Sequence, residues 1–386
     1  MSYEVIDYLI KLGHKVAGSI NEKNAGDYLY KKFSEIINNT KIQSYDFLGW
    51  FLKGKNKIKI LSPHIKKDID FNVFMYSKPI EQKVIGNIEK FGILKQDTNG
   101  TDKQSGMPKF ILKSDRGLEI ANIYANTNIN CKKAVPLANP YNSNIFFNIP
   151  SIVIGLEDYN FILGLLNKNK IVKISFHYEA EYNYNSKTKN IISKIKGNSN
   201  KSIVIGAHYD SAFGTPGAID NCSGVQCLYN LAKYFSEKKL KKTFIFIALS
   251  AEESGHLGSK YYINRLKEQD FLKNIDCFIC IDGIEETKKL LILANPFNLA
   301  KDMYNEILKF KLSKFFKKEN IIPMLPLNLS DSWEFYLEGI PTIFLEHTPS
   351  MVWHLPQDNT YKKRDIDLWT EFYIYYINRL DNSLIL

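Results

Sequence analysis

Six side chains that bind metals or transfer protons follow one another along the second half of this 386-residue chain. They are His208, Asp220, Glu252, Glu253, Asp282 and His354. Two imidazoles and three carboxylates match the ligands of two zinc-like ions that share one bridging carboxylate. The sixth side chain, a fourth carboxylate beside a ligand, is suited to act as a general base. The sequence therefore predicts a two-metal site that performs hydrolysis.

The candidate ligands come after apolar segments that are typical of buried strands. The segments 202–207, 243–249 and 277–281 precede His208, Glu252 with Glu253, and Asp282. From about residue 187 such strands alternate with helical segments, which predicts an α/β fold with a mainly parallel sheet and helices on both faces. Because ligands in such folds gather at the carboxyl ends of the strands, we expect these side chains to meet at one edge of the sheet.

Two further aspartates lie close in sequence to the two histidines. Asp210 is two residues after His208, so it points the same way from a strand and is expected to accept a proton from the ring nitrogen that binds no metal. Asp358 is expected to do the same for His354. The ordinary alternatives are that Asp220 is a helix N-cap and that Glu252 and Glu253 are solvated residues at a helix start. Two adjacent carboxylates after a buried strand repel each other, however, unless a cation lies near them.

The composition is that of a globular protein, with 45% hydrophobic and 24% charged residues. The net charge of +10 comes from scattered lysines without a basic stripe, so no nucleic-acid partner is expected. No apolar stretch reaches the roughly 18 residues that cross a membrane, and the N-terminus lacks the pattern of a signal peptide. With five cysteines, an odd number, a cytoplasmic location is expected. Cys277 and Cys280 are expected to pack on opposite faces of one strand rather than to bind metal.

Three parts of the chain differ in pattern. The first contains a helical pattern at about 24–37, the second has short strands separated by polar turns, and the third alternates strands and helices. We expect residues 1–62 and 185–386 to form one catalytic domain, a three-layer sandwich around the central sheet. Residues 63–184 are expected to form an inserted β-rich lobe that narrows access to the metal site.

Several motifs resemble those of the M28 family of zinc peptidases. They are His208-Tyr209-Asp210-Ser211, the segment Gly217 to Gly224, the segment Ala251 to Ser259, Asp282, and His354 with Asp358-Asn359-Thr360. The resemblance implies the zinc-peptidase fold, with a protease-associated-like insert. It implies one ion held by His208, Asp220 and Asp282, and another held by Asp220, Glu253 and His354. Glu252 would be the general base, and the Asp220–Asn221 peptide bond is a candidate for the cis form.

The chain departs from the family pattern at two places. Gly283-Ile284-Glu285-Glu286 follows Asp282, and Ser330-Asp331-Ser332 stands where members commonly have Ser-Asp-His. Two histidines have no assigned role. His256 is expected to lie on a helix face, and His347, which follows the predicted strand 342–345, is the rival of His354 as a ligand.

The most direct interpretation is an aminopeptidase that uses two Zn²⁺ ions, or Co²⁺ or Mn²⁺, on peptides with a free N-terminus. A free α-amino group is suited to bind near the ions and carboxylates. Three different activities stay open beside it: a glutamate-type carboxypeptidase, which needs a basic pocket; a glutaminyl cyclase, which uses one ion; and a non-catalytic relative, which would have lost ligands or the base.

Overall fold

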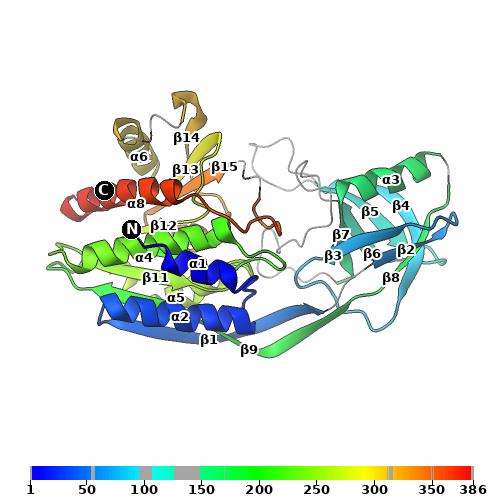
Figure 1. Cartoon of the computed structure of the whole chain (residues 1–386), viewed down its shortest axis with the longest axis horizontal. Coiled ribbons are helices and arrows are strands. Elements are labelled where there is room, and N and C mark those ends of the chain that lie inside the picture. The colour runs from blue at the N-terminus through cyan, green and yellow to red at the C-terminus, as the bar shows by residue number, and fades with distance from the viewer. Residues whose placement is uncertain are drawn as a thin grey trace. The chain divides into compact units, whose positions relative to one another are not determined.

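The computed structural model describes residues 2–53, 57–94, 107–125, 148–168, 170–310, 312, 316–348, 350 and 352–383 (Figure 1). The chain divides into two compact units. One unit comprises residues 1–47 and 187–386, and the other comprises residues 48–186. Cys131 lies outside the described residues. Within the described residues, no helix is both long and apolar enough to span a membrane.

The helices lie mainly in the first unit. They are α1 (Glu4–Lys11), α2 (Ile20–Ile36), α3 (Leu156–Asn167), the π-helical turn η1 (Ala218–Ser223), α4 (Gly224–Ser236), α5 (Leu257–Glu268), η2 (Leu272–Asn274), α6 (Phe297–Lys309), η4 (Lys318–Asn320), α7 (Ser332–Leu337) and α8 (Lys363–Asn382).

The strands are shared between the units, and the long strands β1 and β9 run through both. They are β1 (Thr40–Lys53), β2 (Lys57–Ser62), β3 (Asp68–Val73), β4 (Val84–Leu94), β5 (Met107–Lys113), β6 (Glu119–Ala125), β7 (Ser151–Ile154), β8 (Lys173–Phe176), β9 (Glu179–Ile195), β10 (Ser202–His208), β11 (Thr243–Leu249), β12 (Ile275–Cys280), β13 (Lys289–Asn295), β14 (Ile321–Met324) and β15 (Thr342–Thr348).

The central sheet has eight strands in the order β1-β9-β11-β10-β12-β15-β13-β14. The four central strands β11, β10, β12 and β15 run parallel to one another. Antiparallel pairing joins β9 to β11 and β13 to β15, while β14 runs parallel to β13. The predicted α/β class with a mainly parallel central sheet is therefore confirmed.

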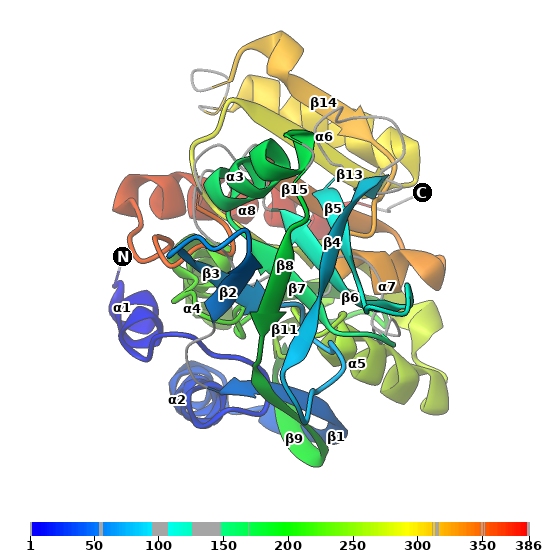
Figure 2. The same ribbon diagram turned by 90° about the vertical axis from the view of Figure 1, so that its right-hand side faces the viewer.

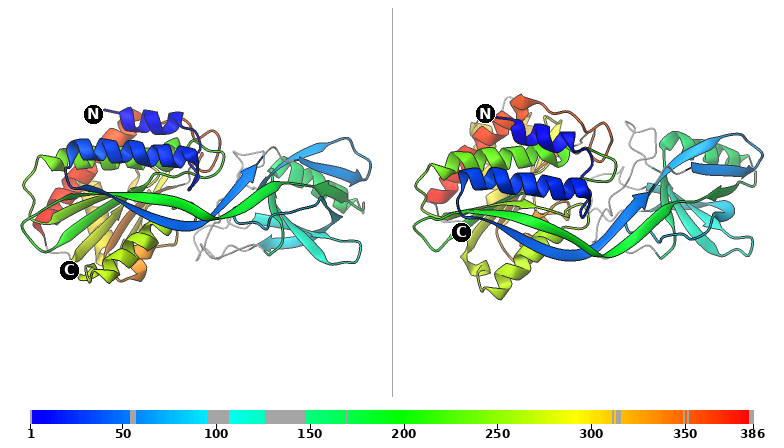
Figure 3. Two further views of the ribbon diagram at one scale, coloured as in Figure 1. Left: turned by 90° about the horizontal axis from the view of Figure 1, so that it is seen from below. Right: turned by 60° about the horizontal axis from the view of Figure 1, so that its bottom comes forward.

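Helices cover both faces of this sheet, which makes three layers. In β10, Ile203 and Ile205 belong to the core that includes residues of α1, α2, α4, α6 and α8, whereas Val204 belongs to the core that includes residues of α5 and α7. Figure 3 shows α1, α2 and α4 side by side over one face. Cys277 and Cys280 follow the same alternation, each in a different core, as predicted for packing residues.

The second unit is a sheet of seven short strands that closes on itself. Its order is β2-β3-β7-β6-β5-β4-β8, and β8 pairs with both β4 and β2 (Figure 2). The helix α3 follows β7, and its Tyr159 stacks on Phe110 of β5. Apolar side chains such as Phe110 and Ile123 are fully buried, so this unit has a hydrophobic core of its own.

In the first unit, Glu22 ties helix α2 to the sheet. Ser19 caps α2 by accepting a hydrogen bond from the Glu22 N–H, and Glu22 Oε2 accepts one from the Gly18 N–H at 3.3 Å. This exchange resembles a capping box, except that Glu22 accepts from the residue before the N-cap, while the Ser19 N–H donates to the Val16 carbonyl. Glu22 Oε1 lies 2.5 Å from the Tyr209 hydroxyl and 2.9 Å from that of Ser250. Burial raises the pKa of Glu22, and these hydroxyl groups oppose that rise.

Removing this carboxylate should weaken the whole unit. Glu22→Ala leaves buried hydroxyl groups without their acceptor, so we expect the free energy of unfolding to fall by about 3 kcal/mol. Glu35→Ala in the same helix is the control, because Glu35 is 45% exposed and its loss should cost less than about 0.5 kcal/mol. Chemical denaturation measures both variants, and equal losses would contradict the role given to Glu22.

Candidate metal centre

Four neighbouring parallel strands deliver the candidate ligands to one edge of the sheet. His208 is the last residue of β10, and Asp282 lies two residues after β12. Glu253 follows β11, and His354 lies in the loop after β15. The fifth residue, Asp220, enters from the π-helical turn η1. The segments that precede His208 and Glu253 are fully buried, so the apolar strands end where the polar site begins.

The first cluster consists of His208, Asp220 and Asp282. The Nε2 atom of His208 lies 3.2 Å from Oδ1 of Asp220 and 3.3 Å from Oδ1 of Asp282. His208 is only 1% exposed, and within the described residues both of its ring nitrogens lack a well-oriented hydrogen-bond partner. A buried imidazole with this surrounding is suited to bind a cation through Nε2.

The second cluster consists of Asp220, Glu253 and His354. The Nε2 atom of His354 lies 3.1 Å from Oδ2 of Asp220 and 3.3 Å from Oε2 of Glu253. Asp220 therefore turns one oxygen to each cluster, which is the geometry of a bridging carboxylate. The structure brings all five predicted ligand residues together.

The donor set and its spacing fit divalent ions. Two ligand atoms about 2.1 Å from an ion at a tetrahedral angle lie about 3.4 Å apart, close to the four separations above. Imidazole nitrogen with carboxylate oxygen is a set that suits zinc. The residues present can thus hold two ions, with Asp220 between them.

The loop before Asp220 needs its glycine. Gly217 has a φ of 64°, and a Cβ atom there would lie 2.2 Å from the carbonyl oxygen of Asp220. The Asp220–Asn221 bond is cis, as the family resemblance implied. The side chain of Asn221 then accepts a hydrogen bond from the Gly224 N–H at 3.0 Å and donates one to the Ile281 carbonyl at 2.9 Å. These contacts fix the bridging residue against the end of β12.

Asp358 supports Asp220 rather than His354, contrary to the expectation from sequence. Its two carboxylate oxygens accept hydrogen bonds from the N–H groups of Ile219 and Asp220 at 2.7 and 3.0 Å. Burial raises the pKa of Asp358 to about 7, although these two hydrogen bonds oppose the rise. Asp358 lies only four residues from His354 in sequence, which suggested the wrong partner. Its actual contact with Asp220 joins residues 138 positions apart.

Asp210 lies close to His208, without a well-oriented hydrogen bond to its ring, and makes two hydrogen bonds that the sequence did not indicate. Its Oδ1 lies 3.4 Å from Nδ1 of His208. Its two oxygens also accept hydrogen bonds from the backbone N–H groups of Glu252 and Glu253 at 3.1 and 3.2 Å. One buried carboxylate therefore orients a ligand on β10 and the acidic turn after β11.

The remaining ligand carboxylates each have one oxygen held by the protein. Glu253 Oε1 accepts a hydrogen bond from the Ala212 N–H at 3.0 Å, and Asp282 Oδ2 accepts one from the Ser330 hydroxyl at 2.7 Å. The other oxygen of each faces a histidine of its cluster. This division orients each carboxylate before any ion binds.

The charges of the site perturb one another strongly. Burial lowers the pKa of His354, but Glu253 and Asp220 outweigh it and raise the value to about 10. Burial raises the pKa of Glu253. Asp220 is the opposite case, because the two imidazoles hold its pKa well below the usual range despite burial. Such an excess of buried negative charge favours bound cations.

The two unassigned histidines have different surroundings. The ring of His347 lies edge-on to Trp369 at 4.7 Å, and burial lowers its pKa to about 4, so it is a core residue and not the rival ligand. His256, which was expected to lie on a helix face, is the residue just before α5. Its Nε2 lies 3.4 Å from Glu252 and its Nδ1 lies 3.2 Å from Glu334.

Two acidic residues near the site were missed from sequence. Burial raises the pKa of Glu285 to about 7, and it raises that of Glu346 well above the usual range with a further contribution from Asp282. Glu346 is 8% exposed, and its carboxylate makes no hydrogen bond or ion pair with any described residue. A carboxylate directly after the apolar run Ile343-Phe344-Leu345 of strand β15 was the available signal. Gly283 belongs to the segment after Asp282 that departs from the family pattern. A Cβ atom there would lie 2.6 Å from the indole of Trp353, so glycine leaves room for that ring.

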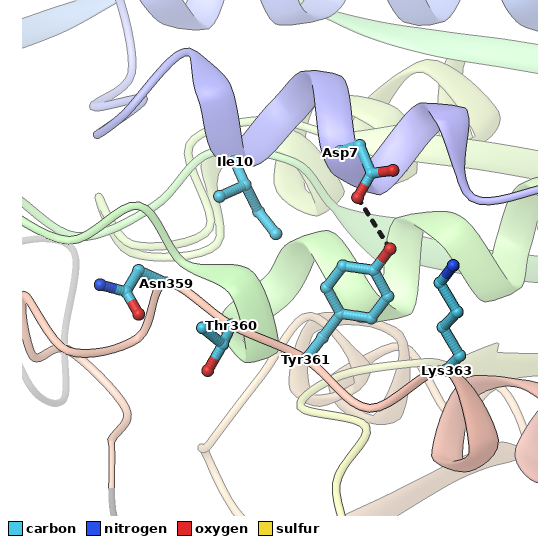
Figure 4. A pocket seen from close by; sticks show the side chains of 6 residues that line it. All are labelled: Asp7, Ile10, Asn359, Thr360, Tyr361 and Lys363. Carbon is cyan, nitrogen blue, oxygen red and sulfur yellow. Dashed lines mark hydrogen bonds between the residues drawn. The ribbon is translucent and has the colours of Figure 1, made fainter.

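A hydrogen bond to α1 fastens the chain that follows the His354 loop. Figure 4 shows a shallow pocket between these parts, in which the Tyr361 hydroxyl donates to Asp7 at 2.7 Å. Asn359 and Lys363 line the same pocket from the segment after Asp358. The N-terminal helix therefore helps to hold the segment that carries His354 and Asp358.

Comparison with known proteins gives a family match for the site-bearing part. Residues 190–376 match the model of Peptidase family M28. Among curated proteins, a probable leucine aminopeptidase 2 of Aspergillus oryzae is 28% identical over 165 residues, which are 41% of this chain and 33% of that protein. The chain thus covers only a third of the length of that relative.

Solved structures share the fold over nearly the whole chain. A peptidase M28 precursor from Shewanella amazonensis has a TM-score of 0.76 at 19% identity, covering 99% of this chain and 93% of its own. A zinc aminopeptidase from Bacillus subtilis has a TM-score of 0.67 at 19% identity, covering 97% and 94%. At these identities the likeness concerns the fold.

The support that Asp358 gives to Asp220 can be tested by metal titration. In Asp358→Asn, an amide NH₂ would face one of the two backbone N–H groups, so we expect Zn²⁺ to bind about 10- to 100-fold more weakly. Calorimetric titration of chelator-treated protein measures this. Asp270→Asn is the control, because Asp270 is 82% exposed. Unchanged affinity in Asp358→Asn would contradict the assigned role.

Proposed function

We propose that this chain, whose residues 190–376 match the model of Peptidase family M28, is a zinc-dependent aminopeptidase that releases N-terminal residues from peptides. The relatives described as aminopeptidases support this direction. The observation that carries it is the surplus of buried carboxylates around the two clusters. Glu285 and Glu346 add two acidic groups beyond the five proposed ligands, and burial raises the pKa of both, so a nearby cation would favour their ionised forms.

The proposed ions have separate ligands and one shared bridge. His208, Asp220 and Asp282 would hold one Zn²⁺, and Asp220, Glu253 and His354 would hold the other. The two compact clusters, with an imidazole and two carboxylates in each, support this assignment. Co²⁺ or Mn²⁺ suits the same oxygen and nitrogen donors. A bound pair of ions would supply Lewis acidity, which lowers the pKa of a water molecule and polarises the scissile carbonyl.

Glu252 is the proposed general base. Its neighbour Glu253 faces the second cluster, whereas Glu252 faces His256, so its carboxylate is not needed as a ligand. Glu252 would take a proton from the attacking water and return it to the leaving amine. Asp210 would keep His208 and the Glu252–Glu253 turn in place through the contacts described above.

A substrate with a free α-amino group suits the charge of the site. Within the described residues, no lysine or arginine forms an ion pair with the five ligand residues, Glu252, Glu285 or Glu346. An ammonium group of a substrate could therefore bind beside Glu346, whose buried carboxylate has no other cation. A glutamate-type carboxypeptidase needs a basic pocket for the substrate carboxylate, and no such lysine or arginine pairs with these residues, which disfavours that activity.

Neither a cyclase nor a non-catalytic protein has a specific observation in its favour. A glutaminyl cyclase would use one ion, whereas two complete clusters are present. A non-catalytic relative would have lost a ligand or the base.

We further propose that residues 63–184 are a protease-associated-like insert in a catalytic domain of residues 1–62 and 185–386. A cytoplasmic location remains a prediction, supported by four free cysteines among the described residues.

Substitutions of the neighbouring residues Glu252 and Glu253 distinguish the proposed base from the proposed ligand. The wild type should contain two Zn²⁺ per chain by elemental analysis. Glu252→Gln should keep both ions and lose about 10²- to 10⁴-fold in kcat, because only proton transfer is removed. Glu253→Gln should lose the second ion. Equal metal loss in both variants would reverse the roles, and one ion in an active wild type would favour the cyclase.

The preference for a free N-terminus can be tested with matched peptides. N-acetylation should lower kcat/KM by more than about 100-fold, because it removes the ammonium group that the carboxylates bind. Glu346→Gln should raise KM for free-amine peptides by about tenfold. Glu286→Gln serves as the control, since Glu286 is 40% exposed and pairs with Arg364. Efficient internal cleavage, or cleavage of blocked peptides that end in glutamate, would rule out the aminopeptidase.

A further inference from the structure

His256 links the proposed base to helix α7. It lies just before α5, where its backbone φ is 57°. Its Nε2 is 3.4 Å from Oε1 of Glu252, and its Nδ1 is 3.2 Å from Oε1 of Glu334. The three side chains are between 10% and 13% exposed. The imidazole therefore bridges two carboxylates that are 82 residues apart in sequence.

The doubly protonated form of the ring fits this position. Ionised carboxylates only accept hydrogen bonds, and a neutral imidazole has one N–H, so only the imidazolium donates to both neighbours. Burial lowers the pKa of His256, but Glu252 and Glu334 outweigh it and raise the value to about 10. Asp331 contributes in the same direction, and Lys260 Nζ lies 3.6 Å from the same Oε1 atom of Glu334.

We propose that His256, anchored by Glu334, is a positioning residue that fixes Oε1 of Glu252 and leaves its other oxygen free for proton transfer. This inference rests on the proposed peptidase function, in which Glu252 is the base. A glutamate carboxylate rotates broadly about its last torsion, and a misplacement of about 1 Å can cost on the order of 100-fold in rate. Holding one oxygen removes that freedom.

Four variants and one spectrum test the proposal. His256→Asn keeps a residue that tolerates positive φ but loses the charged bridge. We expect kcat to fall about 10- to 100-fold, with KM within about twofold and with unchanged zinc content. Glu334→Gln should lower kcat less, and the double variant should be no slower than His256→Asn. Lys260→Met is the control, because it removes the other cation near Glu334 and should leave kcat unchanged.

Nitrogen NMR of labelled histidines gives a readout that is independent of turnover. The wild type should show two N–H groups on the ring of His256 at pH 7.5, and Glu334→Gln should shift them. A neutral ring, independent losses in the double variant, or unchanged kcat in His256→Asn would overturn this inference. Absence of peptide hydrolysis by the zinc-loaded wild type would instead overturn the proposed function.

Discussion

The structure depends on how buried carboxylates at one edge of the sheet are kept apart or neutralised. The buried or nearly buried members are Asp210, Asp220, Glu252, Glu253, Asp282, Asp331, Glu346 and Asp358. Each would cost several kcal/mol if it were left charged and uncompensated. For six of them compensation comes from backbone N–H groups, hydroxyl groups and imidazoles, whereas the carboxylates of Asp331 and Glu346 have no hydrogen-bond partner among the described residues. The neighbouring groups of each carboxylate therefore determine whether it is suited to bind a metal, to transfer a proton or to hold the backbone.

Glu252 and Glu253 illustrate how surroundings separate two identical side chains. Both backbone N–H groups donate to Asp210, so the turn itself is shared. Beyond the turn, Glu253 meets the Ala212 N–H and His354, whereas Glu252 meets His256. One carboxylate thus faces a candidate metal cluster, and the other faces the imidazole of His256. Sequence proximity alone does not distinguish them.

Much of the fold could be predicted because local patterns determine it. Apolar runs such as 243–249 matched the observed strands, since each is buried along its length. The helix expected at about 24–37 begins earlier, at Ile20, because Ser19 caps it. The candidate ligands were recognisable for the same reason, as polar residues at the ends of buried strands. That rule holds for His208 and Asp282 without any knowledge of their partners.

The contacts that orient the site could not be predicted, because they join distant segments. Asp358 was assigned to His354, four residues away, yet it holds Ile219 and Asp220 across the fold. His256 was assigned to a helix face, yet Glu334 reaches it from another helix. A spacing of two or four residues in the sequence indicates only the direction in which a side chain can point. Which carboxylate occupies that direction is decided by the packing of loops at the sheet edge. The candidate ligands can therefore be identified from the local sequence. The orientation of the ligands and of the proposed base depends on contacts across the whole fold.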